Sequence, residues 1–299
     1  MKRPVALAAL LLLAAAPVLA AHDLFLKLTS YYVTPGHEPV RVPVLNGTFA
    51  RSENSVARDR VRDATLVGFG GVIHLGTSGW SVSGDTSYLT FPVRQAGTYV
   101  VGASTRPRTI ALSAQDFNDY LREDGILDVL DARTRRGELA KPARERYAKH
   151  VKAVFQAGEP RTSAYGAVLG YPAEIVPLAN PYAARVGDSL AVRCLVHGKP
   201  VANQVVIAGG ERAVEGGQPT SARAAPTAGA AQPTQSAQPT PRIHPIPQQL
   251  VRTDRDGVAR IGLGEPGKWY VKFVNMVPVA GDSTLDYESQ WATLTFEVR

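Results

Sequence analysis

The chain has 299 residues, a formal net charge of +7, 44% hydrophobic residues and a single cysteine. A lone cysteine excludes a disulfide-stapled scaffold, and the apolar run around Cys194 favours a buried, unreactive thiol. Basic residues are scattered, with the densest group at Arg133, Arg135 and Arg136. The charge therefore indicates solvation, and we expect no nucleic-acid partner.

Residues 1–20 have the layout of a secretory signal peptide. Lys2 and Arg3 precede an Ala/Leu run that ends in small residues at Ala20. A membrane anchor is disfavoured because the apolar run is shorter than the roughly 20 residues that span a bilayer, and no later stretch is long enough. We expect a periplasmic or secreted protein with no membrane span in the mature chain, which would begin at Ala21 or His22.

Short β-type runs follow over residues 21–113. In SYLTFPV, for example, Leu89, Phe91 and Val93 fall on one face, which is typical of a half-buried antiparallel strand. Gly, Pro and Asn separate these runs. The pattern predicts an N-terminal β-sandwich.

A helical hairpin is predicted over 114–160. Ser113 is a suitable N-cap for a first helix, with Phe117, Tyr120 and Leu121 on one face. A second helix is expected to begin near 141–142 and to end at Gly158, because apolar residues recur at i, i+4, i+7 and i+8 from Tyr147.

The β pattern returns over 161–299 and predicts a C-terminal sandwich, closed by a strand in which Leu294, Phe296 and Val298 alternate with polar residues. Residues 211–247 contain no aromatic residue and are rich in Pro, Ala, Gln, Thr and Gly. Such a segment buries too little apolar surface to offset its ordering entropy, so we expect a disordered inter-strand loop. The fold class is mostly β, with two sandwich modules and a helical hairpin between them.

Candidate chemistry is limited to histidines, since no nucleotide-binding loop, nucleophile elbow, metalloprotease helix or cysteine-based zinc motif is present. No two of the six histidines have the spacing of a local chelate. His22 is the best ligand candidate, because cleavage would leave a free α-amine beside its imidazole, and Asp23 could add an oxygen. The alternative is a solvent-facing histidine at a terminus.

The other histidines are weaker candidates. His150 is expected to be partly buried and hydrogen-bonded, and His74 lies on a strand with either side possible. His37, His197 and His244 are interpreted as structural or solvent-facing.

The segments AHDLFLKL, VPVLNGTF, ARERYAKHVKAVFQAG, YPAEIVPLANPY and YESQWATLTFEV together resemble a bacterial secreted family of unknown function, often labelled a nickel-uptake substrate-specific component. This resemblance covers nearly the whole mature chain. It implies a periplasmic location, immunoglobulin-like or transthyretin-like sandwich modules and metal traffic. The membrane-spanning part that the label implies is missing from this chain.

Three functional hypotheses remain open. The first is a non-enzymatic periplasmic binding protein that holds or delivers nickel, cobalt, copper or zinc through His22, with an envelope transporter or another envelope protein as partner. The second is a structural module of the cell envelope that binds a protein or a glycan. The third is a copper oxygenase, which would need His74 or His150 close to His22.

Overall fold

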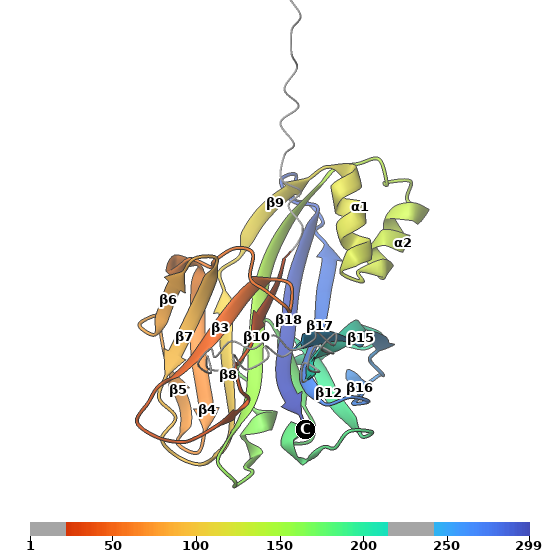
Figure 1. The fold of residues 1–299 in the computed structure, drawn as a ribbon. Coiled ribbons are helices and arrows are strands. Elements are labelled where there is room, and N and C mark those ends of the chain that lie inside the picture. The colour runs from red at the N-terminus through yellow and green to blue at the C-terminus, as the bar shows by residue number, and fades with distance from the viewer. Residues whose placement is uncertain (1–21, 215–241) are drawn as a thin grey trace, which may run out of the picture.

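The computed structural model describes residues 22–214 and 242–299, which form three β-sheets and a pair of short helices (Figure 1). The predicted signal peptide and the middle of the proline-rich segment lie outside the described residues. In the described part of the chain, no helix is long and apolar enough to cross a membrane.

A ten-stranded sheet forms the centre of the molecule. Its strands follow the order β15 (Arg242–Arg252), β14 (Val205–Val214), β17 (Gly267–Pro278), β18 (Tyr287–Val298), β10 (Ala143–Ala157), β8 (Gly97–Thr105), β4 (Val61–Gly68) and β5 (Gly71–His74), with β2 (Tyr32–Val33) and β9 (Arg108–Leu112) also paired to β10. β10 and β18 run parallel, from Glu145 opposite Tyr287 to Ala153 opposite Thr295. The strand content confirms the mostly-β class. Because this one sheet contains strands from both sides of the boundaries predicted near 113 and 161, two separate sandwich modules are not confirmed.

Two four-stranded sheets cover opposite faces of the central sheet. The N-terminal sheet consists of β1 (Asp23–Leu26), β3 (Val40–Gly47), β7 (Thr86–Phe91) and β6 (Trp80–Ser83). The C-terminal sheet consists of β11 (Ala173–Pro177), β12 (Ser189–Val196), β13 (Lys199–Pro200) and β16 (Val258–Gly262).

Hydrogen bonds from the central sheet identify the two faces. Thr293 and Thr295 on β18 donate to the carbonyl oxygens of Leu24 and Leu26 on β1 at 2.8 and 2.5 Å. Lys152 lies opposite Leu294 in the register of β10 and β18, and it instead contacts β11. Because successive side chains of a strand point to opposite faces, β1 and β11 cover different sides.

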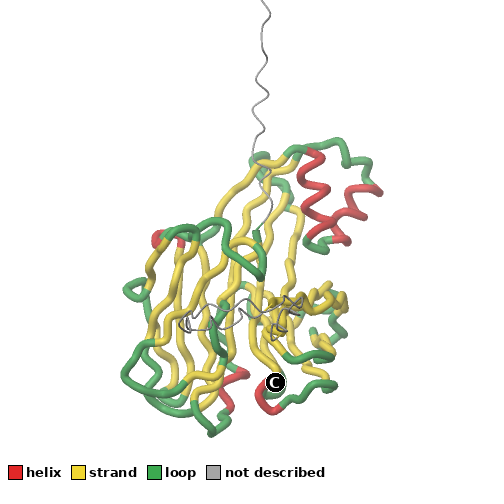
Figure 2. Tube along the Cα trace, in the orientation of Figure 1, coloured by secondary structure: helices red, strands yellow, loops and turns green. Residues whose placement is uncertain are grey.

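The helices are α1 (Ala114–Glu123) and α2 (Leu127–Arg135), and they lie together at one end of the long strands (Figure 2). The Ser113 hydroxyl accepts the backbone N–H of Asp116 at 3.2 Å, which confirms the predicted N-cap. Tyr120 stacks on Trp291 with ring centroids 5.8 Å apart. Trp291 has the same parity on β18 as Thr293, so the helices share the face that the N-terminal sheet covers. Three 3₁₀ turns complete the elements: η1 (Arg58–Arg60), η2 (Ser163–Gly166) and η3 (Pro181–Ala183).

The predicted second helix is wrong, because the segment forms the fifteen-residue strand β10. Both of its faces are buried over most of its length, so polar residues do not alternate with apolar ones. Val151, Ala153 and Phe155 face the N-terminal sheet, whereas His150, Lys152, Val154 and Gln156 face the other way. The hairpin predicted over 114–160 is thus limited to α1 and α2.

The predicted loop over 211–247 is shorter than expected. β14 continues to Val214 and β15 begins at Arg242, and these two residues are direct partners in the antiparallel register. The remainder of the predicted loop lies outside the described residues.

Candidate functional site

His22 lies immediately before β1, with a quarter of its side chain exposed. Its Nδ1 is 3.2 Å from a carboxylate oxygen of Glu53, and its Nε2 is 3.2 Å from the amide nitrogen of Asn54. Because an amide N–H donates, Nε2 accepts, which leaves the ring proton on Nδ1 facing Glu53. The Lys149 ammonium donates to the backbone carbonyl of His22.

Asp23, which could add an oxygen ligand beside His22, takes part in a buried ion pair. One of its carboxylate oxygens is 2.6 Å from the Lys272 ammonium, which also contacts Asp124 at 3.0 Å. Burial opposes the charge on Lys272, but the two carboxylates outweigh it and raise the pKa of the ammonium. Burial raises the pKa of Asp124 to about 6. This buried triad joins the C-terminal end of α1, the central sheet and β1 through one carboxylate oxygen of Asp23, and the other oxygen of Asp23 is buried without a hydrogen-bond partner.

His150 is buried on the face covered by the C-terminal sheet. The Ser104 hydroxyl lies 2.9 Å from its Nδ1, and the Gln290 side-chain oxygen lies 2.9 Å from its Nε2. Burial lowers its pKa to about 4. Both ring nitrogens have protein partners, which confirms the expectation of a hydrogen-bonded core histidine.

His74 lies on β5 at the edge of the central sheet, with three quarters of its side chain exposed. It contacts Thr65 and Asp63 on the neighbouring β4. Asp63 in turn accepts the hydroxyl of Tyr171, whose ring is 6.0 Å from that of His150. His74 and His150 therefore belong to the side of the sheet away from β1, and the structure does not bring either of them to His22.

The remaining expectations about single residues agree with the structure. His37, His197 and His244 are exposed. Cys194 is buried and free, and burial raises the pKa of its thiol. Across residues 22–214 and 242–299, no group of three or more His, Cys, Asp and Glu side chains is arranged to hold a metal ion.

A cavity of about 240 Å³ lies close to His22 and contains a feature that sequence reasoning missed. Arg60, Arg108 and Lys149 all line it, and its other lining residues are Leu24, Asn46, Ser55, Val56, Ala57, Thr105 and Tyr147. Burial lowers the pKa of Arg60, and the nearby charge of Arg108 lowers it further. Burial also lowers the pKa of Lys149 to about 8. The expectation of scattered basic residues did not anticipate that these three line one cavity.

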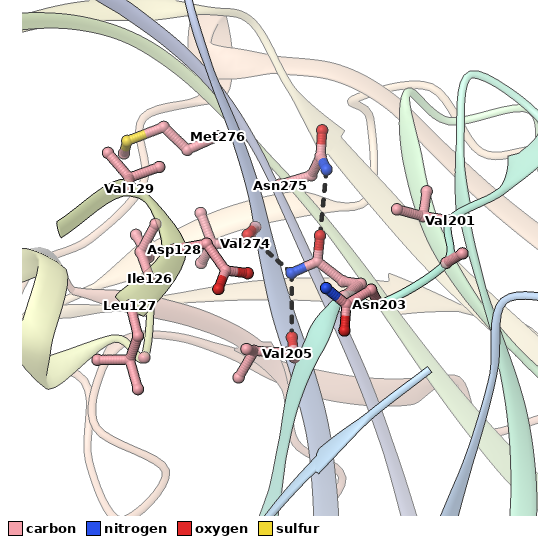
Figure 3. Close-up of a pocket in the computed structure, with 13 residues that line it drawn as sticks. Ile126, Leu127, Asp128, Val129, Val201, Asn203, Val205, Val274, Asn275 and Met276 are labelled. Carbon is pink, nitrogen blue, oxygen red and sulfur yellow. Dashed lines mark hydrogen bonds between the residues drawn. The ribbon is translucent and has the colours of Figure 1, made fainter. Parts of the chain in front are cut away.

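A second cavity, of about 210 Å³, lies between the turn that joins the helices and strands β14 and β17 (Figure 3). Its central amide, Gln204, donates to the carbonyl oxygens of Val205 and Val274 and accepts from Asn275, each at 3.1 Å. The carboxylate of Asp128 is bound by Arg252 at 2.8 Å. These polar groups satisfy one another, so the site near His22 is the stronger candidate.

The fold and this site define a mostly-β protein that carries a partly exposed histidine–carboxylate pair next to a basic cavity. The chain belongs to the family described as "Domain of unknown function (DUF4198)", whose model matches residues 19–276. A comparison with curated protein sequences returned no match.

Similar solved structures include the D0–D1 domain of intimin, with 13% identity over 92% of this chain and 97% of that chain and a TM-score of 0.20. Trypsin-activated alpha-2-macroglobulin from Escherichia coli has 9% identity over 93% of this chain and 16% of that one, with a TM-score of 0.21. Dimeric latent PorU from Porphyromonas gingivalis has 10% identity over 93% and 20%, with a TM-score of 0.20. TM-scores of this size support no conclusion about shared fold or function.

Proposed function

We propose that this chain is a non-enzymatic periplasmic binding protein that holds a transition-metal ion through His22. The observation that carries the proposal is the contact between His22 and Glu53, in which the ring proton faces a carboxylate 3.2 Å away. A carboxylate behind an imidazole fixes its tautomer and makes the opposite nitrogen a stronger ligand. The nitrogen offered to a metal is then Nε2.

Asn54 is compatible with this role. Its amide nitrogen lies 3.2 Å from Nε2 and would have to turn away when a metal binds there. The rotated amide presents its oxygen, which is a second neutral donor for the same ion. An imidazole nitrogen suits nickel, copper and zinc, and the general affinity of such sites rises from cobalt through nickel to copper. The α-amine expected beside His22 falls outside the described residues and stays a prediction.

Two features of the sequence support the location and the cargo. The layout of residues 1–20 is that of an export signal. The family resemblance adds a nickel-uptake label and immunoglobulin-like or transthyretin-like modules. A protein of this kind would pass its ion to an envelope transporter or another envelope protein.

Calorimetric titration of the mature protein with nickel, cobalt, copper and zinc tests the proposal. We expect saturable binding of at least one ion, lost in His22→Ala and weakened about 10- to 100-fold in Glu53→Gln, since a carboxylate that accepts a proton from a ligand histidine has effects of that size. His37→Ala is the matched control, because it removes another accessible histidine. Absence of binding tighter than millimolar for all four ions, or equal binding in His22→Ala, would refute the proposal.

A structural or interaction module of the envelope is the second candidate, and the edge of the central sheet favours it. Phe69, Val72 and Ile73 lie on or next to the edge strand β5 with exposed fractions of 66%, 62% and 48%. Exposed apolar edge strands readily pair with another chain. Recovery from periplasmic extract of one stable partner that binds the wild type but not Val72→Lys would support this function. Recovery of chaperones alone would count against it.

A further inference from the structure

We propose that the cavity lined by Arg60, Arg108 and Lys149 binds a small organic anion with two or more carboxylate groups. This inference concerns a different ligand from the metal bound through His22 and does not depend on that proposal. The sequence separates these cations widely, but the fold brings them around one cavity of about 240 Å³ whose lining contains no Asp or Glu.

Among the described residues, no carboxylate is in ion-pair contact with the cations of this cavity, although Asp23, Asp124 and Glu145 favour the charge of Lys149 from a greater distance. In the described part of the chain, Arg60, Arg108 and Lys149 take part in none of the ion pairs, whereas Lys27, Arg146, Lys152, Arg252 and Lys272 each pair with a carboxylate. Neighbouring arginines outside the lining also find acceptors: Arg58 donates to the Trp80 carbonyl at 2.7 Å and Arg106 to the Asp59 carbonyl at 3.1 Å.

The donors of the cavity are correspondingly available. A guanidinium carries five N–H donors, and the side chains of Arg60 and Arg108 donate no hydrogen bond to any described residue. Lys149 uses one of its three donors on the His22 carbonyl. Arg60 is half-buried and none of its nitrogens is among the buried unpartnered atoms, so its donors are free to bind a ligand that enters from solvent.

Like charges gathered in a cavity whose lining holds no carboxylate destabilise the empty protein, and such clusters are typical of binding sites. Arg60 and Arg108 are close enough for the charge of Arg108 to lower the pKa of Arg60. A dianion between them would remove this repulsion and accept from both groups. Thr105, on the adjacent end of β8, already anchors Lys149 by accepting its backbone N–H at 2.9 Å.

The geometry of the two guanidinium groups favours carboxylate ligands in particular. Two planar guanidinium forks suit two carboxylate groups, each of which accepts a pair of parallel N–H bonds. The lining also includes Leu24, Val56 and the ring of Tyr147, which can contact the carbon chain of such an anion, and Asn46, Ser55 and Thr105, which add polar groups.

Calorimetry on the full mature chain at low salt provides the test, with succinate and citrate as probes and phosphate, sulfate and acetate as comparison ligands. We expect succinate or citrate to bind at least 10-fold more tightly than acetate and more tightly than phosphate or sulfate. Added salt should weaken this binding. Tighter binding of phosphate than of either carboxylate would overturn the assignment to organic anions, and no binding of any dianion would overturn the site itself.

Charge-neutral variants locate the site. Arg60→Gln and Arg108→Gln should each weaken succinate or citrate binding by 10-fold or more. Arg62→Gln is the matched control: Arg62 is an exposed arginine two residues from Arg60 that does not line the cavity. Arg108 is exposed, so its variant tests the site even where Arg60→Gln fails to fold. His22→Ala should keep anion binding, which separates this result from failure of the metal site. Equal binding by Arg108→Gln and wild type would refute the proposal.

Discussion

The buried imidazole of His150 should make this protein less stable in mild acid. Its pKa lies near 4 in the folded protein, because burial disfavours the charged ring. The hydrogen bond that the ring donates to Gln290 and the charge of Glu174 favour protonation, while Arg62 and His197 oppose it. The unfolded chain has an ordinary histidine pKa of about 6.5. Between these two values only the unfolded state binds the proton.

The sign and size of the effect follow from this difference. Stability attributable to the neutral ring is fully present above pH 6.5 and is lost as the pH falls from 6.5 to 4. A shift of about 2.5 pKa units corresponds to about 3 kcal/mol in total. About 2.5 kcal/mol of this loss falls between pH 7 and pH 4.5.

Urea unfolding of the wild type and His150→Gln at several pH values between 7 and 4.5 measures this loss. Gln does not titrate and retains a hydrogen-bonding group for Ser104 or Gln290. All other titrating groups affect both proteins alike, so the difference between the two free energies of unfolding isolates His150. From pH 7 to pH 4.5, the wild type should lose about 2.5 kcal/mol more free energy of unfolding than His150→Gln does. His37→Gln controls for loss of an exposed histidine. Parallel curves for wild type and His150→Gln would refute the reasoning.

Three other predictions follow from packing. Lys152→Met should lower the free energy of unfolding in urea by about 3–5 kcal/mol, because Glu174, 1% exposed, would stay buried without its ammonium partner. Adding Glu174→Gln should restore part of that stability. Gly210→Ala should cost about 1–3 kcal/mol by the same assay, since its Cβ would lie 2.2 Å from the Lys268 carbonyl oxygen; an unchanged midpoint would contradict this. Replacing 215–241 by a short Asn-Gly turn should leave the Tm in calorimetry equal or higher, because the flanking strand ends are direct partners and a shorter loop costs less entropy, whereas a large drop would show that this segment contributes to the packed structure.

Alternation of side chains predicted the half-buried strands well. Leu89, Phe91 and Val93 were expected on one face, and all three are buried in the core beneath the N-terminal sheet. Such a strand has one solvated face, so its polar residues mark the period directly. The α1 cap at Ser113 was predictable for a similar reason, because capping depends on residues three positions apart.

The same reasoning failed for β10, where both faces are covered. Buried polar groups there bind each other across strands: Lys152 pairs with Glu174 on β11, and Glu145 accepts the Tyr120 hydroxyl from α1 at 3.0 Å. Polar residues at such positions look solvent-exposed in a one-dimensional pattern. The apolar residues counted from Tyr147 therefore matched the period of a helix by coincidence. The partners that would have decided the question are remote in sequence.

The candidate site shows why local spacing cannot reveal such chemistry. His22 precedes β1, Glu53 belongs to the loop after β3, and Lys149 on β10 of the central sheet donates to the His22 carbonyl. No short motif connects these residues. Once the segment is known to be a strand, however, Tyr147 and Lys149 must share a face, and Arg108 lies opposite Tyr147 in the antiparallel register of β9 and β10. Knowing the strand would therefore have placed two of the three cations together, and the error about secondary structure was also the reason that the basic cavity was missed.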